Sequence, residues 1–181
     1  IKNFEHINPD LLLGKDNVII FFDESGSILK FDSESKLIWR KNYYSKKEKK
    51  QNPSIHFASD NKIIIAADNL SNLYALDYLT GDLLWKNLSS SSFNSEIKVF
   101  KDKFFLVDFD NVIRCISIKD GNELWKFSTE KSFIKSQRKL SLIILNDLVI
   151  FIDTFGDINA LDINSGNLVW QAQTVNEDIF E

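Results

Sequence analysis

The sequence predicts an all-β protein built from four repeated units of four short antiparallel strands, and three observations support this. The chain has four tryptophans, and each closes a copy of one motif, clearest at residues 73–85 and 158–170. The tryptophans are 46, 40 and 45 residues apart. Each unit also has short β-branched and aromatic runs between turn signals. A period of about 40–45 residues with four strands is the signature of a β-propeller blade.

The local composition predicts each strand in turn along the chain. Residues 18–22, Val-Ile-Ile-Phe-Phe, have the composition of a buried strand, and Asp and Gly residues supply the turn after them. The later units repeat this plan, each with four runs. No helix is expected, because no segment keeps a 3.6-residue apolar period. After a short apolar run at 10–14, the expected strands are 18–22, 27–32 and 37–42; 54–59, 62–68, 72–77 and 83–87; 95–100, 103–108, 112–117 and 123–127; and 140–145, 148–153, 157–162 and 168–173.

We expect a single propeller-type domain over residues 1–181, with repeats at approximately 10–45, 54–89, 95–129 and 139–174. The longer connections between these repeats are polar or charged, as surface loops should be. A single unit buries too little apolar surface to be stable alone, so stacked neighbours must create the shared core.

Four positions of the motif have a physical explanation. The turn between the third and fourth strands needs a positive φ, which glycine adopts without steric cost. An aspartate four residues earlier can accept main-chain hydrogen bonds across the turn. A small residue two positions before it leaves room for a neighbouring ring, and each tryptophan, burying roughly 200 Å², is expected to dock one unit onto the next. The predicted structural residues are Trp39, Trp85, Trp125 and Trp170; Gly81, Gly121 and Gly166; Asp77 and Asp162; and Ala75 and Ala160.

The first and third units depart from this motif. The first has Ser35 and Lys36 where glycine is expected, which predicts a shorter turn. It also has Lys30 at the small position, which predicts a terminal or exposed edge. In the third unit Ser117 replaces the aspartate, and Cys115 is interpreted as a small core residue.

Composition excludes several classes of function. The net charge of −4 gives no general attraction to nucleic acid or acidic membranes. No run of about 18 apolar residues exists, so no transmembrane helix is expected, and no signal peptide is visible. The single cysteine excludes an intrachain disulfide and leaves the compartment open. The basic run at 46–50 is interpreted as a solvated loop, with contact to an acidic partner or lipid head groups as the alternative.

No catalytic, metal-binding or cofactor-binding residue is predicted. The only histidines, His6 and His56, lack partners at ligand spacing. Asp68, Asp108 and Asp153 recur in turns, where they are interpreted as turn-stabilising residues.

The order of small residue, aspartate, Thr-Gly turn and tryptophan resembles the pyrroloquinoline-quinone-type (quinoprotein-like) propeller repeat family. The resemblance covers all four units, from about residue 10 to 174, and is most specific in the second and fourth. It implies four-stranded blades in a ring that usually has eight. Four repeats would then be part or half of a propeller, and self-association or a second half-propeller would cover the open ends.

The resemblance implies two classes of function. Quinone-dependent dehydrogenases of this family need calcium, a carboxylate base and, in several members, adjacent cysteines, whereas Cys115 has no cysteine neighbour. Other members are scaffolds, including a lipoprotein of the outer-membrane β-barrel assembly machinery. We therefore expect a non-enzymatic periplasmic scaffold without a cofactor that binds proteins such as barrel-assembly components. Any lipid anchor to the outer membrane would lie on a segment outside these residues. The alternatives are a dehydrogenase fragment and a luminal or extracytoplasmic sensor domain.

Overall fold

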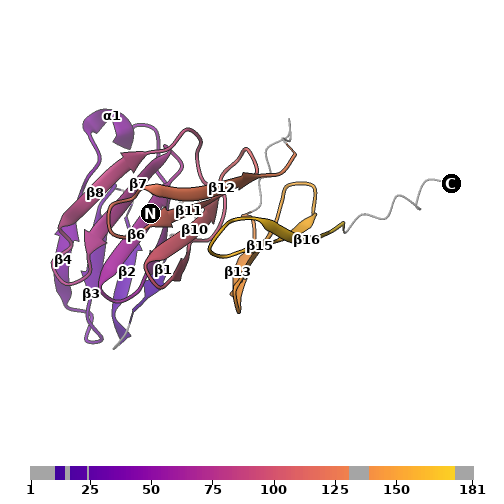
Figure 1. The fold of residues 1–181 in the computed structure, drawn as a ribbon. Coiled ribbons are helices and arrows are strands. Elements are labelled where there is room, and N and C mark those ends of the chain that lie inside the picture. Colours follow the sequence, from indigo (N-terminus) through magenta and orange to yellow (C-terminus); the bar gives the residue numbers. More distant parts are fainter. Residues whose placement is uncertain (1–10, 15–16, 24, 131–138, 174–181) are drawn as a thin grey trace.

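The computed structural model describes residues 11–14, 17–23, 25–130 and 139–173. These residues form sixteen strands in four separate four-stranded antiparallel sheets. The sheets stand face to face in chain order (Figure 1), and the prediction of an all-β, propeller-type fold is confirmed. We call the sheets blades 1 to 4.

Each blade is a meander in which every strand pairs with the next along the chain. Blade 1 contains β1 (Leu11–Leu13), β2 (Ile19–Phe22), β3 (Ile28–Phe31) and β4 (Leu37–Lys41). Blade 2 contains β5 (Ile55–Ser59), β6 (Ile63–Asp68), β7 (Asn72–Asp77) and β8 (Leu83–Leu88). Blade 3 contains β9 (Lys98–Phe100), β10 (Lys103–Val107), β11 (Val112–Ser117) and β12 (Glu123–Ser128). Blade 4 contains β13 (Leu142–Leu145), β14 (Leu148–Ile152), β15 (Ile158–Asp162) and β16 (Leu168–Ala172).

The first strands of the blades lie together along one side. β5 contacts both β1 and β9, and β9 contacts β13. The fourth strands form the opposite edge of each sheet, and each carries the tryptophan of its unit. A β-bulge between the third and fourth strands recurs in every blade. It leaves the small residue paired with the tryptophan in blades 2 to 4, as in Ala75 with Trp85, and Lys30 paired with Trp39 in blade 1.

Three apolar cores fill the spaces between successive blades. Because side chains alternate across a strand, a central blade sends one set to each neighbour. Ile65 of β6 packs toward blade 3 with Phe104, whereas the adjacent Ile64 packs toward blade 1 with Ile20. All four side chains are fully buried. Blades 2 and 3 are therefore covered on both faces, which explains why their central strands are almost continuously apolar.

The expectation of no helix is wrong at one place. A single-turn helix, α1 (Lys46–Lys49), lies between β4 and β5 and buries none of its residues. It is held by a capping box: Ser45 Oγ accepts from the Glu48 amide at 3.3 Å, and Glu48 Oε2 accepts from the Ser45 amide at 2.7 Å. A helix without a buried face needs no apolar period, so periodicity could not detect it.

The first strands of units three and four begin later than expected. β9 starts at Lys98 rather than at 95, and β13 starts at Leu142 rather than at 140. Ser95 makes an isolated parallel bridge with Leu140 instead, and its hydroxyl accepts from the Val107 amide at 2.7 Å. These residues tie blade 3 to blade 4 instead of extending either sheet.

Candidate functional site

The tryptophans of blades 1 to 3 lie against glycines of the following blade. The pairs are Trp39 with Gly81, Trp85 with Gly121 and Trp125 with Gly166. A Cβ on these glycines would lie between 2.6 and 2.8 Å from a ring carbon, closer than van der Waals contact permits. The glycines also have φ between +71° and +74°. Both the backbone and the available space therefore require glycine at these three positions. We call the three tryptophan–glycine contacts the joints.

Two joints share a hydrogen bond from the indole. In the second joint Trp85 Nε1 donates to Ile118 O at 2.8 Å, and in the third Trp125 Nε1 donates to Ile163 O at 3.3 Å. Each acceptor stands three residues before the joint glycine. The bond fixes the orientation of the ring against the next blade and satisfies a polar group inside the contact.

Lys30 changes the first joint. A terminal or exposed edge was expected here: Lys30 does lie in the first of the described sheets, but only 3% of it is exposed, so the expectation of exposure is wrong. Its Nζ donates to Tyr78 O at 2.7 Å, the carbonyl that an indole takes in the other two joints, and lies 3.5 Å from the centre of the Tyr78 ring. Trp39 Nε1 is left without a partner. Burial lowers the pKa of Lys30, while its attraction to Asp77 opposes that shift.

Aspartates close the turns that carry the joint glycines. Asp77 Oδ1 accepts from the amides of Thr80 and Leu79 at 2.8 and 2.9 Å, and Asp162 Oδ1 makes the same pair of bonds in blade 4. Amide donation to the charged form lowers the pKa of both carboxyls. In the third unit Asp120 stabilises the turn by accepting from the Asn122 amide at 3.2 Å.

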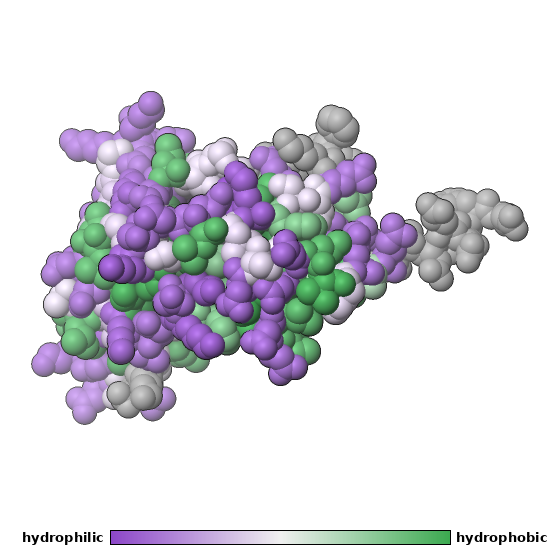
Figure 2. All heavy atoms as spheres, in the orientation of Figure 1, coloured by the Kyte–Doolittle hydropathy of each residue, from purple (hydrophilic) through white to green (hydrophobic). Residues whose placement is uncertain are grey.

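The outer face of blade 4 has no neighbour among the described residues. Trp170 pairs with Ala160, as Trp85 and Trp125 pair with the small residues of their blades, and is 41% exposed. Ile143, Leu145 and Ile152 on the same face are 53%, 54% and 37% exposed. Figure 2 shows apolar atoms gathered at the blade 4 end of the molecule. These four residues form the open docking face.

Blade 1 presents a different open face. Leu11 and Leu13 are 55% and 70% exposed, and the rings of Phe21 and Phe31 stack with 5.7 Å between their centres. The turn between β3 and β4 is short and is closed by Ser35, whose φ is +64°. A side chain therefore stands where the following blades have glycine.

A second set of contacts lies at the opposite end of the third strand from each joint turn, at the aspartate that ends or directly follows the second strand of blades 2 to 4. These junction aspartates are Asp68, Asp108 and Asp153, and all are at least 97% buried. In each, Oδ1 accepts two amide hydrogens from its own turn, as predicted. The other oxygen, Oδ2, has a different environment in each blade.

In the first two junctions Oδ2 has short, direct partners. Asp68 Oδ2 accepts from Tyr44 Oη at 2.8 Å and from Asn72 Nδ2 at 2.9 Å. Asp108 Oδ2 forms a salt bridge with Arg114 Nη2 at 2.9 Å. The buried carboxylates are therefore paired, as low-dielectric surroundings require.

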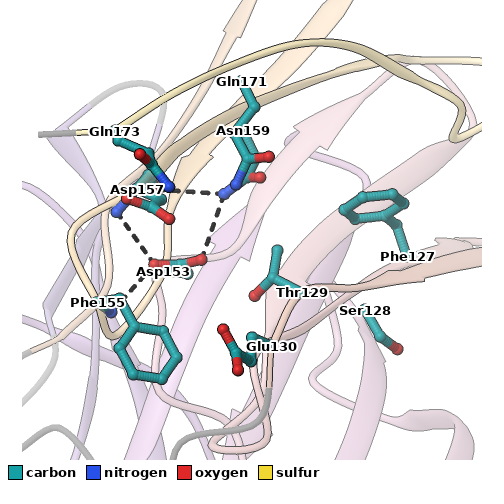
Figure 3. Close-up of a pocket in the computed structure, with 10 residues that line it drawn as sticks. All are labelled: Phe127, Ser128, Thr129, Glu130, Asp153, Phe155, Asp157, Asn159, Gln171 and Gln173. Atoms are coloured by element: carbon teal, nitrogen blue, oxygen red, sulfur yellow. Dashed lines mark hydrogen bonds between the residues drawn. The ribbon is translucent and has the colours of Figure 1, made fainter.

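The third junction opens into a pocket of about 460 Å³ (Figure 3). Asp153, Asp157 and Asn159 of blade 4 line it together with Thr129 and Glu130, which follow β12. Asn159 Nδ2 is turned toward Asp157 O at 3.2 Å and Asp153 Oδ2 at 3.5 Å. Asn159 Oδ1 and Thr129 Oγ1 are buried and have no hydrogen-bond partner.

Comparisons with known proteins agree with this architecture. A family model described as "Outer membrane protein assembly factor BamB" matches residues 24–179. The chain belongs to this family. No curated protein sequence matches the chain.

Solved structures, among them one of BamB, show the same fold. BamB from Moraxella catarrhalis superimposes with a TM-score of 0.77 at 20% identity, over 91% of this chain and 48% of the other. The computationally designed proteins Ika8 and Ika4 give TM-scores of 0.69 and 0.68 at 18% and 14% identity over 90% of this chain, covering 48% and 95% of theirs. The chain thus spans about half the length of the BamB structure.

The remaining candidate residues are placed as follows. His56 lies on β5, and His6 falls outside the described residues. Cys115 is fully buried, and burial raises the pKa of its thiol to about 12. Residues 46–50 form α1 and its C-cap. Within the described ranges no three His, Cys, Asp or Glu side chains are grouped to hold a metal ion, and no helix is long and apolar enough to cross a membrane.

Sequence reasoning missed the junction partners. The aspartates were identified as turn residues, but their second oxygen also contacts the residue six positions later, as Asp108 does Arg114. The residue five positions after the preceding tryptophan completes the junction: Tyr44 bonds to Asp68 directly, and Ser90 bonds to Arg114. Both positions change from blade to blade, so a motif defined by identity does not include them. Superimposing the repeats and reading the variable columns would have found them.

Proposed function

We propose that the chain is part of a non-enzymatic propeller scaffold that binds other proteins during the assembly of outer-membrane β-barrel proteins, in the periplasm. The observation that carries the proposal is the BamB family match over residues 24–179. The geometry supports a scaffold because the repeated motif residues are used to pack blade on blade, and the variable loops are left for binding.

Deletion of the gene in the source organism tests this role. We expect the deletion strain to contain less folded β-barrel protein in its outer membrane, measured by gel electrophoresis of unheated samples, with normal levels of non-barrel envelope proteins. Wild-type protein should restore the level, and a version retained in the cytoplasm should not. Unchanged barrel levels, or a source cell without an outer membrane, would contradict the proposal.

An in vitro measurement separates this function from quinone chemistry. The purified protein should bind the periplasmic part of the barrel-assembly machinery in sedimentation experiments. A change in the quinone absorbance when pyrroloquinoline quinone and calcium are added would instead favour a dehydrogenase fragment.

We also propose that the open docking face of blade 4 receives a further blade. Trp170 needs a glycine opposite it, as Trp125 needs Gly166. Blade 1 of a second copy would place Ser35 opposite Trp170 where a glycine is needed. A blade with a Thr-Gly or Ser-Gly turn therefore fits the open docking face better. Self-association of the isolated chain through these apolar faces stays a prediction, which a monomer mass by light scattering at high concentration would contradict.

A further inference from the structure

The three junctions bring the same three positions together with different side chains. Each consists of the buried aspartate, the residue six positions later on the third strand of its blade, and the residue five positions after the tryptophan of the preceding blade. The sets are Tyr44, Asp68 and Tyr74; Ser90, Asp108 and Arg114; and Glu130, Asp153 and Asn159.

The first two sets contain strong donors for the aspartate. Two tyrosine hydroxyls, at 2.8 and 3.3 Å, donate to Asp68 Oδ2. In the second set the Arg114 guanidinium donates to Asp108 Oδ2 and also to Ser90 Oγ at 3.1 Å. In both junctions a donor therefore lies between the blades.

The third set consists mainly of acceptors. Glu130 stands where Tyr44 and Ser90 stand, and an ionised carboxylate cannot donate. Among the described residues, the side-chain amide that points toward Asp153 Oδ2 is that of Asn159, at 3.5 Å, the outer limit for a hydrogen bond. Asn159 is only 1% exposed, and its Oδ1 has no partner. Buried acceptors without donors are costly, so the site is suited to a ligand that supplies donors and positive charge.

We propose that this pocket binds a guanidinium group, presented by an arginine side chain of a protein ligand. A guanidinium carries five N–H donors in one plane and no acceptor, which suits Asp153 Oδ2, Asn159 Oδ1 and Glu130. The chain uses this pairing one blade earlier, where Arg114 fills the second junction. In the third junction the shorter Asn159 stands in place of Arg114, and the pocket lies where the guanidinium lies in the second junction. The protein source of the arginine rests on the scaffold function proposed above, whereas the affinity for guanidinium does not.

Binding can be measured with N-acetyl-arginine methylamide as the probe and the neutral citrulline analogue as its matched control. In ¹⁵N–¹H NMR titrations we expect saturable shifts of the Asn159 side-chain amide and of Gln171 and Gln173, which also line the pocket. The citrulline analogue should bind at least tenfold more weakly. Absence of saturable shifts at these residues, or equal binding of both probes, would overturn the proposal.

Variants extend the test. N159R supplies the junction with its own guanidinium and should abolish probe binding, and E130S, which restores the residue type of Ser90, should weaken it at least fivefold. E34Q removes one exposed negative charge elsewhere and should bind normally. Near-UV circular dichroism checks folding, and E130S keeps the test valid if N159R fails to fold. Normal binding by either folded pocket variant would refute the site.

The two proposals fail separately. Loss of the guanidinium site by these measurements leaves the barrel-assembly function standing. Normal barrel levels in the deletion strain would overturn the scaffold function and, with it, the protein source of the arginine, while the pocket's affinity for guanidinium would stand.

Discussion

Among the described residues, blades 2 and 3 are covered on both faces and blade 4 on one, and the tryptophan of the same motif docks in one setting and stays partly exposed in the other. The motifs ending at Trp85 and Trp170 are nearly identical, and both tryptophans pair with a buried alanine. Trp85 lies against Gly121, whereas Trp170 is 41% exposed. The motif therefore builds only half of a joint, because the glycine and the carbonyl acceptor belong to the next blade.

The largest expected effect compares the two tryptophans directly. W85A removes a ring that stacks on Phe104 and donates to Ile118 O, and should lower the free energy of unfolding by about 4 kcal/mol. W170A should cost less than about 1 kcal/mol in the isolated chain, because little of its contact is formed there. Urea denaturation followed by circular dichroism measures both. Equal losses would mean that Trp170 is already docked.

The second comparison is between junctions. R114A would leave Asp108, which is fully buried, without its cation, and we expect a loss of about 3 kcal/mol. N159A removes an amide that reaches Asp153 Oδ2 only at 3.5 Å, and should cost about 1 kcal/mol or less. A cost for N159A as large as that for R114A would contradict our description of the third junction as poorly satisfied.

The third comparison concerns the turns. G81A would place a Cβ 2.7 Å from a carbon of the Trp39 ring at a φ of +74°, and should destabilise the protein by about 2 kcal/mol. S35G, at φ +64° on the open face of blade 1, should change stability by less than about 1 kcal/mol in either direction. The urea denaturation midpoints of the two variants, compared with that of the wild type, test both expectations. If G81A is tolerated, the first joint must be able to separate, which the close packing does not suggest.

The sequence predicted the features that recur with the repeat and depend on local chemistry. Glycine in the turn and aspartate as its acceptor can be read within one unit, and the period of the tryptophans can be read by comparing the units. Lys30 could not be placed, because its role depends on a carbonyl of the next blade, at Tyr78. Glu130 and Asn159 line one pocket from two blades, and both positions vary among the repeats, so neither periodicity nor identity marks them. The capping box of Ser45 and Glu48 was readable but lies outside any apolar period.

The smallest effect tests whether α1 is held by its cap or by its ion pair with blade 2. Bonds from Ser45 lower the pKa of Glu48 from 4.5 to about 2, with a smaller contribution from Lys86. The unfolded chain therefore binds more protons between those values, and this part of the stability is present above pH 4.5 and lost as the pH falls toward 2.

E48Q should flatten the decline in urea midpoint between pH 4.5 and 2, because the amide does not titrate. S45A should remove part of the same slope by raising the pKa of Glu48, and K86M should remove less. Added salt should weaken the Lys86 contribution and leave the capping bonds in place, since the side chains of Lys86 and Glu48 are 32% and 25% exposed. A larger effect for K86M than for S45A would mean that the helix is held mainly by its contact with blade 2, and that the local cap is secondary.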